Sequence, residues 1–241
     1  MSAAGSLGGG IIAAGEGSRL RAAGYTMPKP LVPVAGAPLI EWTLRNFVAA
    51  GISRVVIIVN DDGRACVDWV RSRFPALDTE FIVKTTRSSL ESFQEVARRL
   101  DGQRAVMSTV DSCCRPEDFV SFVDTALRRP PEASVLAVTP LVEDENPLWV
   151  RVACDGRVTG LGGRSGSLVT AGMYVVSERA RTAAPPALGR LREFLGWLLA
   201  EGEPLYAESI DTVVDVDRAT DVALAETLLR TWAQSKTLTG R

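Results

Sequence analysis

Histidine is absent from the 241-residue chain. Its absence excludes Ser-His-Asp and Cys-His catalysis, and it excludes every metal site that depends on an imidazole ligand. Cysteine is scarce, and the four residues of this type form no C-x-x-C pair, so neither a zinc knuckle nor a thioredoxin-type motif is expected. We therefore expect any bound metal ion to be held by oxygen atoms.

A long apolar run and an excess of one charge are also missing. No hydrophobic stretch approaches the roughly 18 residues that a transmembrane helix needs. The 27 basic side chains are balanced by 29 acidic ones, which disfavours general binding to nucleic acid or to a membrane surface. No Lys or Arg precedes Arg19, so a secretory signal is not expected, and the few cysteines favour a reduced, cytoplasmic location.

Predicted elements alternate between strand and helix through the first half of the chain. Apolar, β-branched runs predict strands at 10–14, 55–60, 80–85 and 105–111. Apolar residues at spacings of three and four predict helices at 39–50, 66–74, 88–100 and 115–129. Because parallel strands need crossover helices, this alternation predicts a mostly parallel sheet with helices on both faces.

After Pro130-Pro131 the pattern changes. Strands are predicted at 134–141, 148–153, 157–162, 167–177, 205–210 and 212–217, with helices at 191–202 and 219–236. Asp155-Gly156 is a two-residue hairpin signal, so antiparallel strands join the sheet and make it mixed. We expect a Rossmann-like α/β fold in one domain over residues 1–241, with a nucleotide-binding half at about 8–130 and an acceptor-binding half at about 131–241.

A glycine-rich loop, Gly15-Glu16-Gly17-Ser18-Arg19, follows the first predicted strand. Backbone N–H groups of such a loop can wrap phosphates. The loop is not a Walker A motif, because Glu16 stands where the lysine is required. It is not a dinucleotide fingerprint either, because Leu20 stands in place of the third glycine. A phosphate loop that carries its own cation and a flexible strand-to-helix turn remain as the two interpretations.

A proline-rich segment, residues 27–41, comes next. Its four prolines predict an extended, stiff stretch that is neither helix nor central strand. Lysine is rare in this chain, at positions 29, 84 and 236 alone, and Lys29 lies between Pro28 and Pro30. We expect a restrained ammonium at Lys29 that points into a site, with a solvated linker lysine as the alternative.

The two segments AAGEGSRL and PKPLVPVAGAPLIE together resemble the signature of nucleotidyltransferases that join an NTP to a phosphorylated acceptor. Sugar-1-phosphate nucleotidylyltransferases and phosphocholine cytidylyltransferases of glycosyltransferase-A-like fold belong to this family. The resemblance implies that Arg19 contacts the triphosphate and that Lys29 contacts the reacting phosphate. It also implies a set of residues that border the base and phosphates, namely Ala13, Ala14, Gly15, Gly17 and, in the same loop, Ser18.

Three aspartates are candidate metal ligands. Asp111 ends an apolar strand, and an acid at the carboxyl end of a parallel strand faces the crevice where α/β sheets bind ligands. Strand alternation in Val213-Val-Asp-Val-Asp217 places Asp215 and Asp217 on one face. In the resembled family such carboxylates hold Mg²⁺, an ion that takes few protein carboxylates and several phosphate or water oxygens; Mn²⁺ is a substitute. A helix N-cap is the alternative for Asp217.

Other positions bear on the two substrates. Ser88-Ser89-Leu90 resembles the pattern of phosphocholine-type cytidylyltransferases, which favours CTP, then UTP, with Ser89 as a nucleotide-binding residue; a helix cap is the alternative. Sugar-specific members carry a lysine for the acceptor phosphate on their later strands, and this chain has none there. The candidates for binding the acceptor are therefore Arg164, Glu145 and Gly172.

These features predict a nucleotidyltransferase with an NTP and a small phosphorylated acceptor, such as a sugar-1-phosphate or a phosphocholine-like compound, as partners. The attacking phosphate is already an anion, so a chain without histidine needs no general base. No β-helix or acyltransferase repeat follows the domain, so we expect a stand-alone transferase. Alternatives are a molybdopterin nucleotidyltransferase, a glycosyltransferase of the same fold, and a non-catalytic nucleotide-binding regulator.

Overall fold

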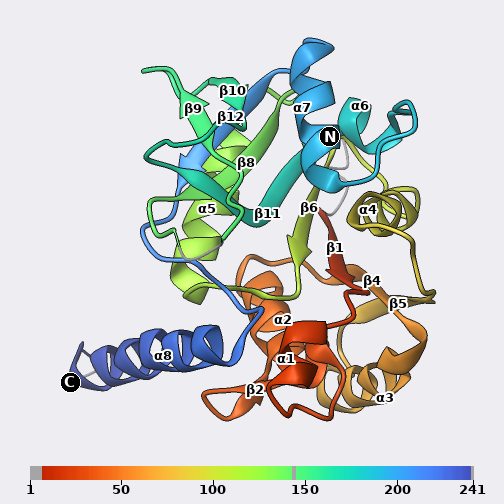
Figure 1. The fold of residues 1–241 in the computed structure, drawn as a ribbon, viewed down its shortest axis with the longest axis vertical. Coiled ribbons are helices and arrows are strands. Elements are labelled where there is room, and N and C mark those ends of the chain that lie inside the picture. The colour runs from red at the N-terminus through yellow and green to blue at the C-terminus, as the bar shows by residue number, and fades with distance from the viewer. Residues whose placement is uncertain (1–6, 143–144, 240–241) are drawn as a thin grey trace, which may run out of the picture.

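A seven-stranded sheet runs through the middle of the computed structural model, which describes residues 7–142 and 145–239 (Figure 1). Its strands are β1 (Gly8–Ala13), β4 (Arg54–Val59), β5 (Asp78–Val83), β6 (Arg104–Thr109), β8 (Ser134–Thr139), β11 (Val169–Ser177) and β12 (Leu205–Ser209). Their order across the sheet is β12-β8-β11-β6-β1-β4-β5. Neighbouring strands are parallel except at β11, which runs antiparallel to both β6 and β8. The predicted mixed, mostly parallel sheet is confirmed.

Apolar side chains cover both faces of the central strands. Ile11 of β1 is buried in one hydrophobic cluster, and its neighbour Ile12 is buried in the other. Val55 and Val56 of β4 divide between the two clusters in the same way. Because successive side chains of a strand point to opposite faces, a strand covered on both sides is apolar at every position.

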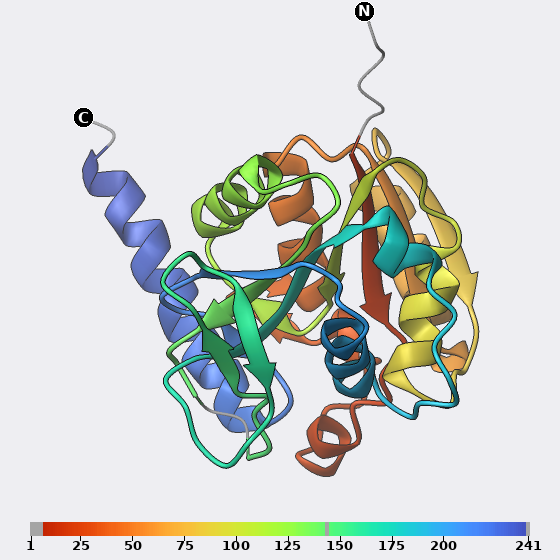
Figure 2. The ribbon, with the colours of Figure 1, turned by 90° about the horizontal axis from the view of Figure 1, so that it is seen from above.

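Helices form the outer layers on both sides of the sheet (Figure 2). One cluster takes in buried residues of α2 (Leu39–Ala49), α3 (Arg64–Arg73), α5 (Pro116–Arg128) and α8 (Ala219–Thr239). The other takes in those of α4 (Ser89–Ala97), α6 (Glu178–Thr182) and α7 (Leu191–Ala200). Within the part of the chain that is described, no helix combines the length and the apolarity needed to cross a bilayer.

Short elements surround the carboxyl ends of the central strands. The five-residue helix α1 (Ser18–Ala22) follows β1, and the 3₁₀ turn η1 (Lys29–Leu31) precedes the small hairpin β2 (Pro33–Val34) and β3 (Ala37–Pro38). A second 3₁₀ turn, η2 (Asp61–Gly63), follows β4. The expectation that the proline-rich segment contains no helix is wrong at η1, because Pro30 lies in its first turn, where no backbone N–H is required.

Two further pairs of short strands complete the fold. The predicted hairpin at Asp155-Gly156 joins β9 (Val150–Val152) to the antiparallel β10 (Val158–Leu161). The strand predicted at 212–217 is much shorter, since only β13 (Val214–Asp215) pairs, with β7 (Ser112–Cys113) directly after Asp111. Asp217 thus lies beyond the strand, and its position is set by the turn into α8.

Candidate active site

Lys29 lies at the centre of a cluster of charged side chains. The turn η1 buries it to 7% exposure, and its Nζ donates to Asp111 Oδ2 at 2.5 Å and also to Asp217 Oδ1. These partners are 82 and 188 residues away along the chain. A solvated linker lysine would be exposed and unpaired, so the structure does not support that interpretation.

Lys29 and Asp111 are held in their ionised forms. Burial lowers the pKa of Lys29, but the charges of Asp111, Asp217 and Asp215 raise it by more, and the net pKa lies above the ordinary value. Burial raises the pKa of Asp111, but the charge and hydrogen bond of Lys29, together with a hydrogen bond from Thr109, bring it below the ordinary value. At neutral pH the site therefore contains a lysine cation beside the Asp111 carboxylate anion.

The glycine-rich loop closes over Lys29. Gly17 has φ +63°, and a Cβ at this position would lie 2.9 Å from Lys29 Cβ, so both the backbone conformation and the close approach require glycine. Arg19, with half of its side chain exposed, reaches back to Asp217 Oδ2 at 3.3 Å. The loop, η1 and the start of α8 thus meet at one point.

The other predicted nucleotide-binding residues divide by burial. Ala13 and Ala14 are buried at the end of β1, whereas Gly15 is exposed in the loop and Ser18 is exposed at the start of α1. A Cβ on Gly15 would meet no atom within 4 Å. Nothing in the described protein requires glycine there, which leaves room for the close approach of a ligand.

Asp217 does not cap helix α8. The backbone N–H groups of Asp217 and Arg218 both donate to Asp221 Oδ2, at 3.0 and 2.7 Å. Asp221, in the first turn of the helix, therefore binds the backbone just before it, and the Asp217 carboxylate pairs with Lys29 and Arg19 instead.

The three aspartates offer a metal ion an incomplete set of ligands. Among the described residues, no group of three or more acidic or cysteine side chains has the arrangement of a metal site. Instead, the charges of Asp111, Asp215 and Asp217 all act on the Lys29 ammonium. Carboxylate oxygens are nevertheless the donors that suit a hard cation such as Mg²⁺, which fills the rest of its shell with phosphate and water oxygens. The donor set fits that ion.

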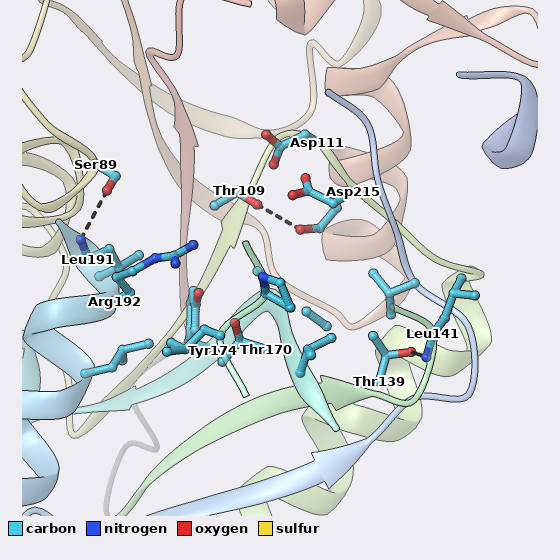
Figure 3. Close-up of a pocket in the computed structure, with 18 residues that line it drawn as sticks. Ser89, Thr109, Asp111, Thr139, Leu141, Thr170, Tyr174, Leu191, Arg192 and Asp215 are labelled. Carbon is cyan, nitrogen blue, oxygen red and sulfur yellow. Dashed lines mark hydrogen bonds between the residues drawn. The ribbon is translucent and has the colours of Figure 1, made fainter. Parts of the chain in front are cut away.

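A cavity of about 290 Å³ opens beside this cluster, and Asp111 and Asp215 line its edge (Figure 3). It lies at the ends of β6 and β8 and beside the first part of β11. The start of α7 closes one side. Its walls are mixed, and the apolar part consists of Leu141, Pro147, Leu148, Val169, Ala171, Leu191, Leu195 and Val213. Its polar side chains are Ser89, Thr109, Ser112, Thr139, Thr170, Tyr174 and Arg192.

The structure brings one of the three predicted acceptor residues to this cavity. Gly172 lines it, whereas Glu145 is exposed and pairs with Arg218 at 2.8 Å. Arg164 is exposed in the loop after β10 and lies outside the cavity lining. Gly162 and Gly163, both with positive φ, turn the chain before it reaches Arg164.

Ser89 joins two helices at the cavity. Its Oγ accepts the backbone N–H of Leu191 at 3.1 Å, which ties the start of α4 to the start of α7. The cap of α4 is the neighbouring Ser88, whose Oγ accepts the N–H of Glu91 at 3.1 Å. The predicted helix cap thus belongs to Ser88, and the proposed contact of Ser89 with a nucleotide stays a prediction.

Arg192 lines the cavity and was not among the residues singled out from the sequence. It is the basic side chain among the described lining residues. The sequence does contain a signal for it, because a cation in the first turn of a helix faces the positive end of the helix dipole, where acids are favoured. An arginine at such a position indicates a second role.

We expect Gly172→Ala to destabilise the protein by about 2–5 kcal/mol. Gly172 has φ +70°, and a Cβ would lie 2.1 Å from Ser112 Oγ and 2.6 Å from Thr109 Oγ1. Urea unfolding measures the change. The control is Gly196→Ala inside α7, where a Cβ meets nothing within 4 Å and should stabilise by about 0.5–1 kcal/mol. Equal stability of Gly172→Ala and the unmodified protein would contradict the steric argument.

A glycine-rich loop at the end of β1, a buried lysine among aspartates and a cavity at the strand ends are the features expected of an α/β nucleotidyltransferase domain. The chain belongs to the MobA-like NTP transferase domain family, which matches residues 9–179. The predicted family and its enzyme class, nucleotidyltransferase, are confirmed by this membership.

Two relatives are similar over most of this chain. The CMP-5'-(3-aminopropyl)phosphonate synthase of Streptomyces rubellomurinus is 28% identical over 75% of the chain and 30% of its own length. The bifunctional IPC transferase and DIPP synthase of Rubrobacter xylanophilus is 30% identical over 95% of the chain and 53% of its own length. The chain thus spans about half or less of these relatives.

Solved structures share the fold. The inositol-1-phosphate CTP transferase from T. maritima superimposes with a TM-score of 0.78 at 16% identity, over 94% of this chain and 97% of that one. UDP-glucose pyrophosphorylase complexed with UDP-glucose gives a TM-score of 0.79 at 14% identity, over 93% and 98%. These likenesses establish the architecture of the sheet and its layers.

Proposed function

We propose that this chain transfers the NMP part of an NTP to a small acceptor that carries a phosphate or phosphonate group, with release of pyrophosphate. The observation that carries the proposal is the buried Lys29 ammonium, which lies between Asp111 and Asp217 beneath the glycine-rich loop. A cation restrained at this point can meet the α-phosphate of a nucleotide whose phosphates lie along Gly15 and Gly17.

The chemistry is an in-line displacement. An oxygen of the acceptor forms a new bond to the α-phosphorus, and the bond from that phosphorus to the oxygen bridging the β-phosphate breaks. The electron pair of the broken bond leaves with pyrophosphate. Because the attacking oxygen is already anionic, no side chain has to remove a proton, and a chain without histidine can perform the step.

The protein contributes position and charge. Lys29 stabilises the negative charge that develops at the α-phosphate, and Arg19 neutralises the departing pyrophosphate. Asp111, Asp215 and Asp217 would hold Mg²⁺, or Mn²⁺ in its place, and the ion would supply charge neutralisation at the triphosphate. Ala13, Ala14, Ser18 and Ser89 complete the proposed nucleotide site.

Cytosine is the proposed base. The Ser88-Ser89-Leu90 pattern favours it, and two relatives act with cytidine nucleotides by name: the CMP-5'-(3-aminopropyl)phosphonate synthase and a 2-aminoethylphosphonate cytidylyltransferase. In a thermal-shift panel we expect CTP to stabilise the protein most and UTP second. A nucleotide at 100 times its Kd adds about 2.7 kcal/mol of stability. A much larger effect of ATP or GTP would overturn the choice of base.

Pyrophosphate release tests the proposed function. The assay pairs each of the four NTPs with sugar-1-phosphates, phosphocholine and aminoalkylphosphonates, with and without Mg²⁺. A non-catalytic regulator would bind nucleotide and release no pyrophosphate under any pairing. A molybdopterin nucleotidyltransferase would release it with the pterin phosphate alone, and a glycosyltransferase would consume a nucleotide sugar instead.

A further inference from the structure

Two side chains in the cavity have hydrogen-bond donors without a partner in the described part of the protein. The hydroxyl of Tyr174 makes no hydrogen bond, although the residue is only 5% exposed. Arg192 donates from Nη2 to the carbonyl of Asn146 at 3.0 Å, and its other guanidinium nitrogens have no partner. Figure 3 shows Arg192 extending from α7 toward the middle of the cavity, with Tyr174 beside it. Donors that line a cavity and have no partner in the protein indicate that a ligand supplies the acceptor atoms of their hydrogen bonds.

The charged groups that act on Tyr174 show that it lies between the aspartate cluster and Arg192. Burial raises the pKa of the Tyr174 phenol, Asp215 and Asp111 raise it further, and Arg192 lowers it. The hydroxyl therefore lies within reach of the charges on both sides. One side is the aspartate cluster beside Lys29, and the other is the arginine.

The start of α7 does not itself offer an anion site. The N–H of Leu191 donates to Ser89 Oγ at 3.1 Å. The N–H groups of Gly189 and Arg190 donate to Glu193 Oε2 at 2.8 and 3.1 Å. Because these backbone donors are already satisfied, the Arg192 side chain is the positive group that this end of the cavity presents.

Four of the remaining hydroxyls of the cavity already take part in hydrogen bonds within the protein. Thr109 Oγ1 and Ser112 Oγ bond to each other at 2.8 Å. Thr139 Oγ1 donates to the carbonyl of Asp211 at 3.3 Å, and Ser89 accepts from α7. Apart from Thr170, Gly172 and the two aspartates, the other lining residues are apolar, so a ligand with many hydroxyl groups would place several of them against apolar side chains.

We propose that Arg192 and Tyr174 hold the phosphate or phosphonate group of the acceptor, and that the rest of the acceptor is a short alkyl chain rather than a polyhydroxylated ring. This inference rests on the proposed nucleotidyl transfer, since the cavity is then the place of the attacking anion. The guanidinium fork and the phenol bind two oxygens of the tetrahedral group and leave another directed at the aspartate cluster. The apolar walls, Leu148 and Leu195 among them, cover the alkyl chain.

Steady-state kinetics with CTP test the acceptor class. The acceptors are 2-aminoethylphosphonate and propyl phosphate as alkyl compounds, and glucose-1-phosphate and inositol-1-phosphate as polyols. We expect kcat/KM at least about 10-fold higher for the alkyl compounds, because a site without partners rejects extra hydroxyls. The phosphonate and phosphate arms separate the two sources of the anion. A preference for either polyol would overturn the inference about the acceptor.

Variants test the two residues. Arg192→Gln should raise the KM for the acceptor at least about 10-fold and leave the KM for CTP within about twofold, because a charge-assisted contact to the acceptor alone is lost. Arg192→Lys should restore only part of the affinity. Tyr174→Phe should raise the same KM by about 3- to 10-fold. Arg128→Gln, an exposed arginine on α5, is the matched control and should change nothing.

Calorimetry separates this inference from the proposed function. Propylphosphonate is titrated into the full chain, alone and with a non-cleavable CTP analogue. Binding that is lost in Arg192→Gln supports the anion site even if the enzyme releases no pyrophosphate with any NTP, a result that would overturn the proposed function alone. The assignment of Arg192 would be overturned if Arg192→Gln changed neither the acceptor KM nor the binding of propylphosphonate. It would also be overturned if Arg164→Gln, instead of Arg192→Gln, raised that KM and abolished that binding.

Discussion

Asp111→Asn should lower turnover by at least about 100-fold while the protein remains folded, because the substitution removes a charge beside the reacting phosphates and preserves the shape of the side chain. The asparagine oxygen can still accept from Lys29, which keeps Asp217 as a second partner. Pyrophosphate release, measured beside a melting curve, reports both effects. EDTA should abolish activity of the unmodified protein, and Mg²⁺ or Mn²⁺ should restore it.

The control for this variant is Asp221→Asn, which changes an aspartate that caps α8 and does not contact Lys29. It should cost about 0.5–2 kcal/mol of stability and little turnover. Full activity of the unmodified protein in EDTA would contradict the metal assignment. Wild-type turnover of Asp111→Asn would contradict the role of the carboxylate.

Lys29→Ala should lower kcat by about 100- to 1,000-fold and raise the KM for the NTP by much less. The reason is that the lost contact is stronger in the transition state, when charge accumulates at the α-phosphate, than in the bound substrate. Lys29→Arg should rescue poorly, because Lys29 is buried and a longer, planar guanidinium cannot occupy the point where Nζ pairs with two aspartates. Steady-state kinetics on both variants provide the test.

Lys84→Ala is the matched control. Lys84 also pairs with two carboxylates, Glu91 and Glu95, at 2.9 Å each, but its side chain is 41% exposed and lies outside the Lys29 cluster. Its loss should affect stability slightly and leave kcat unchanged. If Lys29→Ala keeps wild-type turnover, the catalytic assignment based on the Pro-Lys-Pro segment is wrong.

The layers of the fold were predictable because they follow from local patterns. Continuous β-branched runs such as 55–60 belong to strands covered on both faces, and apolar spacings of three and four belong to helices. The partners of Lys29 were not predictable in the same way. Asp111 and Asp217 are far away in sequence, and only the folded sheet brings them to one ammonium.

The residues predicted to bind the acceptor differ most from those that line the cavity, and the reasons are physical. Arg164 was predicted to replace the lysine that this chain lacks on its later strands, but two glycines turn its loop, and the residue does not line the cavity. Arg192 lies in an amphipathic helix, where an arginine is ordinarily a surface residue. Similarly, the length of β13 depends on its pairing with β7, which no local pattern in 212–217 contains.

The ion pair between Lys29 and Asp217 also sets when the site can exist during synthesis of the chain. A ribosome adds residues from the N-terminus, so Lys29 emerges 188 residues before its partner. At about 5–20 residues per second, the interval is roughly 10–40 s. Most of the sheet is available to fold in that time, whereas the cluster cannot assemble until the turn before α8 has been made. A nascent chain shorter than this turn should therefore bind no nucleotide, and nucleotide binding reports that synthesis has passed the turn before α8.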